Sequence, residues 1–526
     1  MHRDGSQRMT TIDRRTMIAA LAATPIAAAH GARRGGDPVA ITHYGRVRGT
    51  IECDVLAFRG VRYGADTAPR RFQPAIAPTP WRDIVDATAY GPAAPQTKAE
   101  ERTSEDCLFL NVWTPALDAG KRPVMVYFHG GAHAHGSGSD PLYDGANLVR
   151  RGDVVVVTVN HRLAGLGYAY LAELGGPAES GNVGNLDLIL ALQWVRDNIA
   201  NFGGDPGRVM IFGQSGGGAK VVTLMAMAQA RPLFHSAATM SGQHVTAAGP
   251  IHATRRARAW MEKAGAANVG ELARLPVERL VEAMAMTDPI EQKGEISFFS
   301  VVDHRVLFRH PFFPDAPREA KDIPLIIGNT HDETGLFITS MLKRGDTTWE
   351  NLPERLGQEM TKDISPTYVA ERYRALYPDR SPTQILLAAT TAGRSWPGHL
   401  IQAEERAKLG SPTWMYQLDF PSPEAGGVLG AFHTLDIPLV FDNVDAKGSM
   451  TGMSAEARAL AGRIADSFIA LARTGDPNNR SIPHWPRFEL EHRPTMIFDR
   501  EVRIENDPRR EERLLFAPVP YIKPGG

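Results

Sequence analysis

Continuous apolar runs alternate with amphipathic stretches along the chain from Pro123 onward. The runs Val124 to Phe128 and Val154 to Val159 consist mostly of β-branched or aromatic residues, which is typical of strands buried on both faces. Between the second run and a third, Val209 to Phe212, apolar residues recur at helical spacing from Leu186 to Val195. This order of strand, helix and strand predicts a mostly parallel sheet covered by helices.

The same pattern continues toward the C-terminus. Ile323 to Ile327 and Trp414 to Leu418 are predicted strands, and Ala455 to Arg473 is a predicted long amphipathic helix closed by Gly475 and Pro477. Neither a repeat period nor a low-complexity linker interrupts the chain. We therefore expect an α/β fold class, with a mostly parallel central sheet flanked by helices, in one large domain.

Composition narrows the class of protein further. The 526 residues are 43% hydrophobic and 22% charged, which is typical of an ordinary globular protein. The formal net charge is -1, and no basic stripe accompanies it, so a nucleic acid partner has no electrostatic support.

The N-terminus has the features of an export signal. Arg14 and Arg15 precede an apolar stretch, Met17 to Ala29, that ends in small residues. This arrangement predicts a twin-arginine-like signal over residues 1–29 and the folded domain over residues 30–526. A membrane anchor is the alternative, but the stretch is shorter than the roughly 20 residues that a spanning helix needs. We expect an exported protein, periplasmic or secreted, without stable membrane insertion after signal removal.

A serine flanked by glycines follows the third apolar run, in the segment Gly213 to Gly217. Glycines permit the sharp turn from a strand into a helix that leaves one hydroxyl, that of Ser215, exposed as a nucleophile. The motif is short, so a serine in an ordinary turn is the alternative. A serine nucleophile also needs a base and an acid that orients the base, and on this scaffold they follow in the order serine, acid, histidine.

Two carboxylates, Asp332 and Glu333, follow the predicted strand that ends at Ile327, where strand ends deliver active-site groups. Position in the chain does not decide which of the two carboxylates is the acid. The histidines later in the chain are His399, His433, His484 and His492. His433 follows the glycine-containing loop Gly426 to Gly430, from which a histidine can reach the sheet edge, so it is the predicted base. Taken singly, Glu333 is equally consistent with a helix N-terminal carboxylate and His433 with a structural core histidine.

Backbone donors for a developing oxyanion are predicted in a second glycine motif, His129 to Ala132, directly after the first predicted strand. Gly130 and Gly131 lie in this loop, and Gly216 follows the serine. Two motifs that each follow their own strand, in the required order, favour acyl transfer at Ser215 over a set of coincidental structural roles.

With these motifs the chain resembles the type-B carboxylesterase family, which includes the cholinesterases. Glu105 to Trp113 is similar to one signature of that family, and Gly203 to Pro206, leading to the serine motif, is similar to the other. The resemblance runs from about Val39 through the C-terminal helix. It implies a single α/β-hydrolase catalytic domain over residues 30–526 that hydrolyses small-molecule carboxylic esters through an acyl-enzyme on Ser215 and requires no cofactor.

The resemblance also implies roles for individual residues. The family pattern assigns the acid to Glu333 rather than Asp332, matches Gly430 to His433 with the segment that carries the histidine, and points to Ser241 as a buried support. Two rivals remain. One is a non-catalytic adhesion or scaffold protein on the same fold, whose triad would be interrupted; the other is an amidase or peptidase that uses the same triad.

The chain departs from the family beside the serine, where Gln214 and Gly216 replace the common glutamate and alanine. The missing negative charge disfavours choline esters as substrates. Gln214 together with His133, His135 and Lys220 would suit carboxylate-bearing esters.

Metal and disulfide chemistry have little support in the sequence. His133 and His135 lack carboxylate or cysteine companions, so we assign no metal site. The chain has two cysteines, Cys53 and Cys107, and Ala94 stands where the family usually has the partner of Cys107. We therefore expect two free thiols rather than a bridge.

Overall fold

The computed structural model describes residues 36–99, 101–292 and 294–521. The predicted export signal, residues 1–29, lies outside the described residues and stays a prediction. Residues Asp37–Gly526 form one compact unit, which contains all the elements below. Within the described residues, no helix combines the length and apolar character needed to cross a bilayer.

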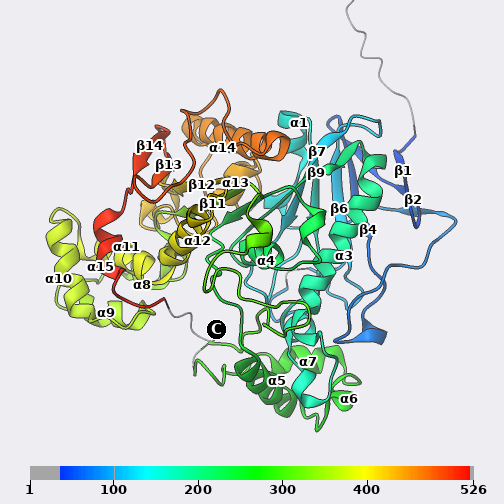
Figure 1. The fold of residues 1–526 in the computed structure, drawn as a ribbon, viewed down its shortest axis with the longest axis horizontal. Coiled ribbons are helices and arrows are strands. Elements are labelled where there is room, and N and C mark those ends of the chain that lie inside the picture. Colours follow the sequence, from blue (N-terminus) through cyan, green and yellow to red (C-terminus); the bar gives the residue numbers. More distant parts are fainter. Residues whose placement is uncertain (1–35, 100, 293, 522–526) are drawn as a thin grey trace, which may run out of the picture. The chain divides into compact units, whose positions relative to one another are not determined.

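An eleven-stranded sheet forms the centre of this unit, in the order β14-β13-β12-β11-β10-β9-β7-β8-β6-β4-β3 (Figure 1). Its strands are β3 (Thr50–Glu52), β4 (Val55–Arg62), β6 (Phe109–Thr114), β7 (Arg122–Phe128), β8 (Val155–Val159), β9 (Gly204–Gln214), β10 (Ser236–Met240), β11 (Leu325–Thr330), β12 (Thr413–Leu418), β13 (Pro494–Phe498) and β14 (Arg503–Asn506). Strands β8 to β13 in this order pair in parallel, whereas β14, β6, β4 and β3 pair antiparallel at the two ends. The predicted mostly parallel sheet is confirmed.

A small second sheet is formed by β1 (Val39–Thr42), β2 (Gly45–Arg48) and β5 (Ile84–Asp86). The helices are α1 (Ala146–Gly152), α2 (Ala164–Tyr168), α3 (Val183–Asn198), α4 (Gly216–Met225), α5 (Pro250–Ala264), α6 (Val269–Leu272), α7 (Val277–Ala283), α8 (Thr339–Arg344), α9 (Leu352–Glu359), α10 (Pro366–Leu376), α11 (Pro382–Arg394), α12 (Trp396–Lys408), α13 (Asp436–Val440), α14 (Ala455–Thr474) and α15 (Arg510–Phe516). Two groups of helices lie beside the sheet, one of α5 to α7 and one of α8 to α11 with α15 (Figure 1).

Alternate residues of β7 face opposite layers of the core. Met125 and Tyr127 belong to the cluster that includes α1 and α14, whereas Val124 and Val126 belong to the cluster that includes α3 and α4. Burial on both faces explains why this strand is a continuous apolar run instead of an alternating pattern. Alternate residues of β8 divide between the same two clusters, so this strand is also buried on both faces. The helices of the two clusters therefore cover opposite faces of the sheet.

The structure contains each predicted strand and helix, but two strands have clearly different bounds. The strand predicted over Val209 to Phe212 spans Gly204–Gln214. The strand expected from Ile323 begins at Leu325 and extends to Thr330. Pro324 has no N–H to donate to a neighbouring strand, so regular pairing starts one residue later. The three additional residues at the other end carry the strand to the loop that holds Asp332 and Glu333.

A buried ion pair ties the end of β8 to α3. Arg162 Nε and Nη2 donate to the Asp187 carboxylate at 2.8 and 2.6 Å, and both side chains are almost fully buried. The backbone N–H of Arg162 donates to the same carboxylate at 3.1 Å. Two residues further on, Ala164 N–H donates to the carbonyl oxygen of His133 at 2.6 Å. This ion pair therefore anchors the segment that supports the loop after β7.

Replacing Asp187 with alanine is expected to lower the free energy of unfolding by about 3–5 kcal/mol, because it leaves the Arg162 guanidinium buried without its partner. Denaturant or thermal unfolding measures the effect. Asp445→Ala is the matched control, because the Arg458 and Asp445 side chains form an ion pair that is about half exposed and solvent screens it. Equal loss of stability in the two variants would contradict a special role for the buried pair.

Candidate active site

Ser215 lies in a sharp turn between β9 and α4. Its backbone has φ 57° and ψ -122°, and its N–H donates to the carbonyl oxygen of Met240 at 2.7 Å. The flanking glycines are required by close packing: a Cβ on Gly213 would lie 2.5 Å from the carbonyl carbon of Gly217, and a Cβ on Gly217 would lie 1.9 Å from the oxygen of Phe128. The turn leaves the Ser215 side chain partly exposed at a cavity.

Glu333 and His433 meet although 100 residues separate them in the chain. His433 Nδ1 lies 2.5 Å from Glu333 Oε2, while Glu333 Oε1 accepts from Ser241 Oγ at 2.6 Å and from the N–H of Thr330 at 3.0 Å. Burial alone would raise the pKa of Glu333, but the His433 ring and the hydroxyl of Ser241 outweigh it and hold the pKa below its ordinary value. Glu333 is therefore an ionised acceptor, and the hydrogen of His433 is on Nδ1.

The other carboxylate and the other histidines have different surroundings. Asp332 accepts from the N–H of Ala431 at 2.9 Å and lies 2.8 Å from His331 Nδ1. His399 is fully buried in α12, and its burial lowers its pKa to about 4. His484 and His492 are exposed. Of the pairs that the sequence left open, the structure joins Glu333 with His433.

The second ring nitrogen of His433 faces the turn that carries Ser215. His433 Nε2 lies 3.3 Å from the side-chain nitrogen of Gln214, the residue before Ser215. Among the described residues, no hydrogen bond joins Ser215 Oγ to His433. The phenyl ring of Phe337 lies 5.1 Å from the imidazole and helps to enclose it. With Nδ1 protonated, Nε2 can accept a hydrogen bond or a proton.

The glycine loop after β7 packs directly against this turn. A Cβ on Gly130 would lie 2.8 Å from the carbonyl oxygen of Gln214 and 3.4 Å from Ser215 Cβ. In the described part of the chain, the N–H groups of Gly130, Gly131 and Gly216 have no hydrogen-bond acceptor. Three free backbone donors thus lie in the two segments that contact each other beside Ser215.

A cavity of about 550 Å³ opens at Ser215. Its lining includes Phe299 from the segment after α7, and Gln358, Glu359, Thr361 and Lys362 from the end of α9 and the loop that follows it. Of the four residues that suggested carboxylate-bearing esters, only His133 is among the lining residues, because Gln214 contacts His433 and Lys220 is buried on backbone carbonyls. The structure thus gives Lys220 a different environment from the expected one.

The charged groups that do line the cavity were missed by the sequence analysis. They are Glu291, Glu359, Lys362 and Arg394. Lys362 Nζ lies 4.0 Å above the ring of Tyr521, and the Arg394 guanidinium lies 4.7 Å from the ring of Phe337. No sequence motif marks these side chains, because they come from three separate parts of the chain that only the fold brings to the cavity: the segment after α7 for Glu291, the end of α9 and the loop after it for Glu359 and Lys362, and the end of α11 for Arg394.

The match to known proteins covers nearly the whole chain. The model of the carboxylesterase family matches residues 36–516. Para-nitrobenzyl esterase of Bacillus subtilis is 35% identical over 501 residues, which are 91% of this chain and 98% of that protein. The chain belongs to the carboxylesterase family.

Further relatives place this carboxylesterase among enzymes that hydrolyse esters. Phenmedipham hydrolase of Pseudarthrobacter oxydans is 33% identical to it, over 86% of this chain and 93% of that protein. A solved carboxylesterase of Geobacillus stearothermophilus superposes with a TM-score of 0.80 at 34% identity, covering 90% of this chain and 99% of the other. The predicted α/β-hydrolase fold is confirmed, and the protein is a carboxylic ester hydrolase.

Both cysteines of the carboxylesterase are free thiols, as expected. Cys53 is exposed in the turn between β3 and β4, and Cys107 is fully buried. Burial raises the pKa of the Cys107 thiol, which keeps it protonated and unreactive.

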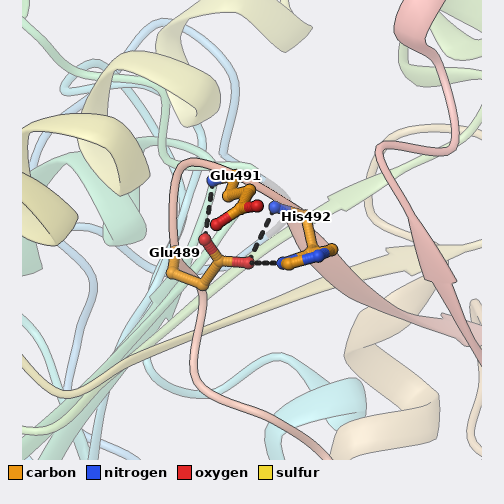
Figure 2. A group of neighbouring side chains, drawn as sticks. All are labelled: Glu489, Glu491 and His492. Carbon is orange, nitrogen blue, oxygen red and sulfur yellow. Dashed lines mark hydrogen bonds and ion pairs between the residues drawn. The ribbon is translucent and has the colours of Figure 1, made fainter.

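Figure 2 shows one further group of potential metal ligands, Glu489, Glu491 and His492. Glu489, Glu491 and His492 have ligand atoms within 4.8 Å of one another in the turn before β13. The Glu489 carboxylate already accepts from the N–H groups of Glu491 and His492 and lies 2.8 Å from His492 Nδ1. The Glu489 carboxylate thus stabilises the turn in which all three residues lie, which explains why they are close together. We assign no metal to this group.

Proposed function

We propose that this carboxylesterase hydrolyses small-molecule carboxylic esters through an acyl-enzyme on Ser215. The observation that carries the proposal is the connected series Ser241, Glu333 and His433, which ends with Nε2 facing the turn of Ser215. A buried carboxylate that accepts from three donors keeps His433 in the tautomer whose Nε2 can take a proton. A serine hydroxyl needs such a base to act as a nucleophile near neutral pH.

In the acylation step, Ser215 Oγ bonds to the ester carbonyl carbon while its proton passes to His433 Nε2. The electron pair of the carbonyl π bond moves onto oxygen, and the N–H groups of Gly130, Gly131 and Gly216 donate to this oxyanion. When the carbonyl re-forms, the ester C–O bond breaks and the alcohol leaves with the proton from Nε2.

Deacylation repeats the step with water as the nucleophile. Water gives a proton to His433 Nε2 and bonds to the acyl carbon, and the same three N–H groups bind the second oxyanion. The bond to Ser215 Oγ then breaks, the proton returns to Oγ, and the carboxylic acid departs. Atoms and charge balance without a cofactor.

The substrate proposal rests on the cavity. The relatives have names as different as Phenmedipham hydrolase and Fumonisin B1 esterase, so relatedness does not select one substrate. The lining carries both signs of charge, with Lys362 and Arg394 against Glu291 and Glu359. This balance supports small neutral esters as the first substrates to test, and the neutral Gln214 beside Ser215 gives no attraction to a choline group.

A matched pair of substrates tests the reaction class. A p-nitrophenyl ester and the p-nitroanilide of the same acyl group are expected to differ strongly in kcat/KM, in favour of the ester. Comparable rates would instead support the amidase or peptidase alternative. A fluorophosphonate probe is expected to form one adduct, on Ser215; absence of both labelling and turnover would favour the non-catalytic scaffold.

A further inference from the structure

Lys220 is a fully buried lysine in α4, five residues after Ser215. Its Nζ donates to the carbonyl oxygen of His129 at 3.1 Å and to that of Ala132 at 3.0 Å. Within the described residues it forms no ion pair with a carboxylate. Burying an ammonium group without a counter-charge is costly, and burial lowers the pKa of Lys220 to about 7. An apolar residue would avoid this cost at the same position.

Among the residues that the structure describes, no other cationic side chain donates a hydrogen bond to these two carbonyls. Burial, followed by the nearby charge of Lys220, lowers the pKa of both His129 and His161, so these imidazoles are neutral. Burial lowers the pKa of His135 as well. Lys220 is thus the group whose N–H bonds hold the loop after β7 against α4.

The hydrogen bond from Lys220 to the His129 carbonyl oxygen orients the peptide group between His129 and Gly130. The carbonyl of His129 and the N–H of Gly130 belong to the same planar trans peptide, so they point in opposite directions. When Lys220 holds the oxygen, it also fixes the direction of the Gly130 N–H, which has no acceptor within the described chain. A donor on the oxygen also polarises the peptide and strengthens the N–H as a donor.

The hydrogen bond from Lys220 to the Ala132 carbonyl oxygen explains why glycine stands at position 216, directly after Ser215. A Cβ on Gly216 would lie 1.9 Å from the Ala132 oxygen and 2.4 Å from its carbonyl carbon. Both atoms are backbone, so the loop would have to move to accept a side chain, and the Lys220 to Ala132 bond would be strained or lost. Lys220 and Gly216 are therefore structurally linked, and Gly216 is one of this chain's departures from the family pattern.

We propose that Lys220 is a positioning residue for the oxyanion-binding loop: its two bonds orient the Gly130 N–H toward the reacting carbonyl and require glycine at position 216. This inference rests on the proposed function, because it assigns the loop the role of binding the oxyanion. Lys220 acts through the backbone and does not contact the substrate.

Lys220→Met tests the role, because methionine fills a similar volume without an N–H donor. We expect kcat to fall by roughly 10- to 100-fold, somewhat less than the 10²–10³-fold typical of removing an oxyanion donor outright. KM is expected to change little, and a trifluoromethyl ketone that forms a tetrahedral adduct is expected to bind more weakly by a similar factor. Thr223→Val is the matched control, since the Thr223 hydroxyl donates to the carbonyl oxygen of Ala219 within the same helix α4.

Gly216→Ala tests the link from the other side, and its effect in the wild-type background does not depend on whether the Lys220 variant folds. In the wild-type background we expect a large loss of kcat, and in the Lys220→Met background a clearly smaller additional loss, because the loop is then free to move. A folded Lys220→Met enzyme with wild-type kcat, or an equal effect of Gly216→Ala in both backgrounds, would overturn the proposal. If Ser215→Ala keeps its turnover, the proposed function itself fails; if that variant is inactive and Lys220→Met is fully active, the Lys220 proposal alone fails.

Discussion

Replacing Ser215 with alanine is expected to lower kcat by roughly 10⁶-fold, because in the proposed mechanism Ser215, His433 and Glu333 act as a unit. The substitution removes only Oγ, which makes no hydrogen bond to His433 in this structure, so the fold is expected to remain intact. Ester turnover with protein freed of contaminating esterases measures the loss, and thermal unfolding confirms the fold. Ser481→Ala, in an exposed turn far along the chain, is the matched control.

The same variant separates acyl-enzyme chemistry from other routes to hydrolysis. A folded Ser215→Ala protein that retains even a hundredth of the wild-type kcat would contradict the assignment of Ser215. The residual rate is expected to come from the oxyanion-binding groups and substrate binding alone, which in related chemistry supply about 10³–10⁴-fold over water.

Replacing Glu333 with glutamine is expected to lower kcat by about 10⁴-fold. The amide has nearly the same size, but its NH₂ group cannot accept from His433 Nδ1–H while the amide oxygen accepts from Ser241 and Thr330. The imidazole then turns to its other tautomer, and Nε2 loses the ability to take the serine proton. Asp332→Asn is the matched control, since Asp332 contacts His331 and Ala431. Greater loss in the Asp332 variant would contradict the assignment.

The same substitution has an expected effect on stability against pH. The folded-state pKa of Glu333 lies below its value in an unfolded chain, so ionised Glu333 stabilises the fold above the unfolded-state pKa. This contribution is lost only as the pH falls through the lowered folded-state pKa. At neutral pH, the Glu333→Gln variant is therefore expected to unfold at a lower temperature than the wild type. This difference in unfolding temperature is expected to shrink as the pH is lowered. A difference that grows with falling pH would contradict this sign.

The two structural supports of the site differ in kind. Ser241, which the family resemblance indicated only as a support, donates directly to the buried carboxylate of Glu333. Lys220, which the sequence associated with substrate charge, instead holds the backbone of the loop that carries Gly130. Both act on the geometry of other groups, so a sequence pattern that seeks reactive side chains has no means to find the second.

Local patterns in the sequence determined much of the architecture. The strands β7, β8 and β12 and the helix α14 were predicted because each buries a long apolar surface whose spacing depends only on its own residues. Strand β10 was missed because Ser236–Met240 is short and rich in small residues, and it is a strand only because β9 and β11 pair with it on both sides.

Ser215 and the glycine loop were also readable from the sequence, since the turn needs glycines at fixed offsets. The choice between Asp332 and Glu333 is different in kind. The position of the two adjacent carboxylates left both open, and the family resemblance pointed to Glu333. The tertiary structure supplies the physical reason, because it brings Glu333 to His433, 100 residues away, while Asp332 contacts its neighbour His331. The partners of Lys220 were decided in the same way, because contacts between distant segments depend on sheet register and helix packing, which no local spacing encodes.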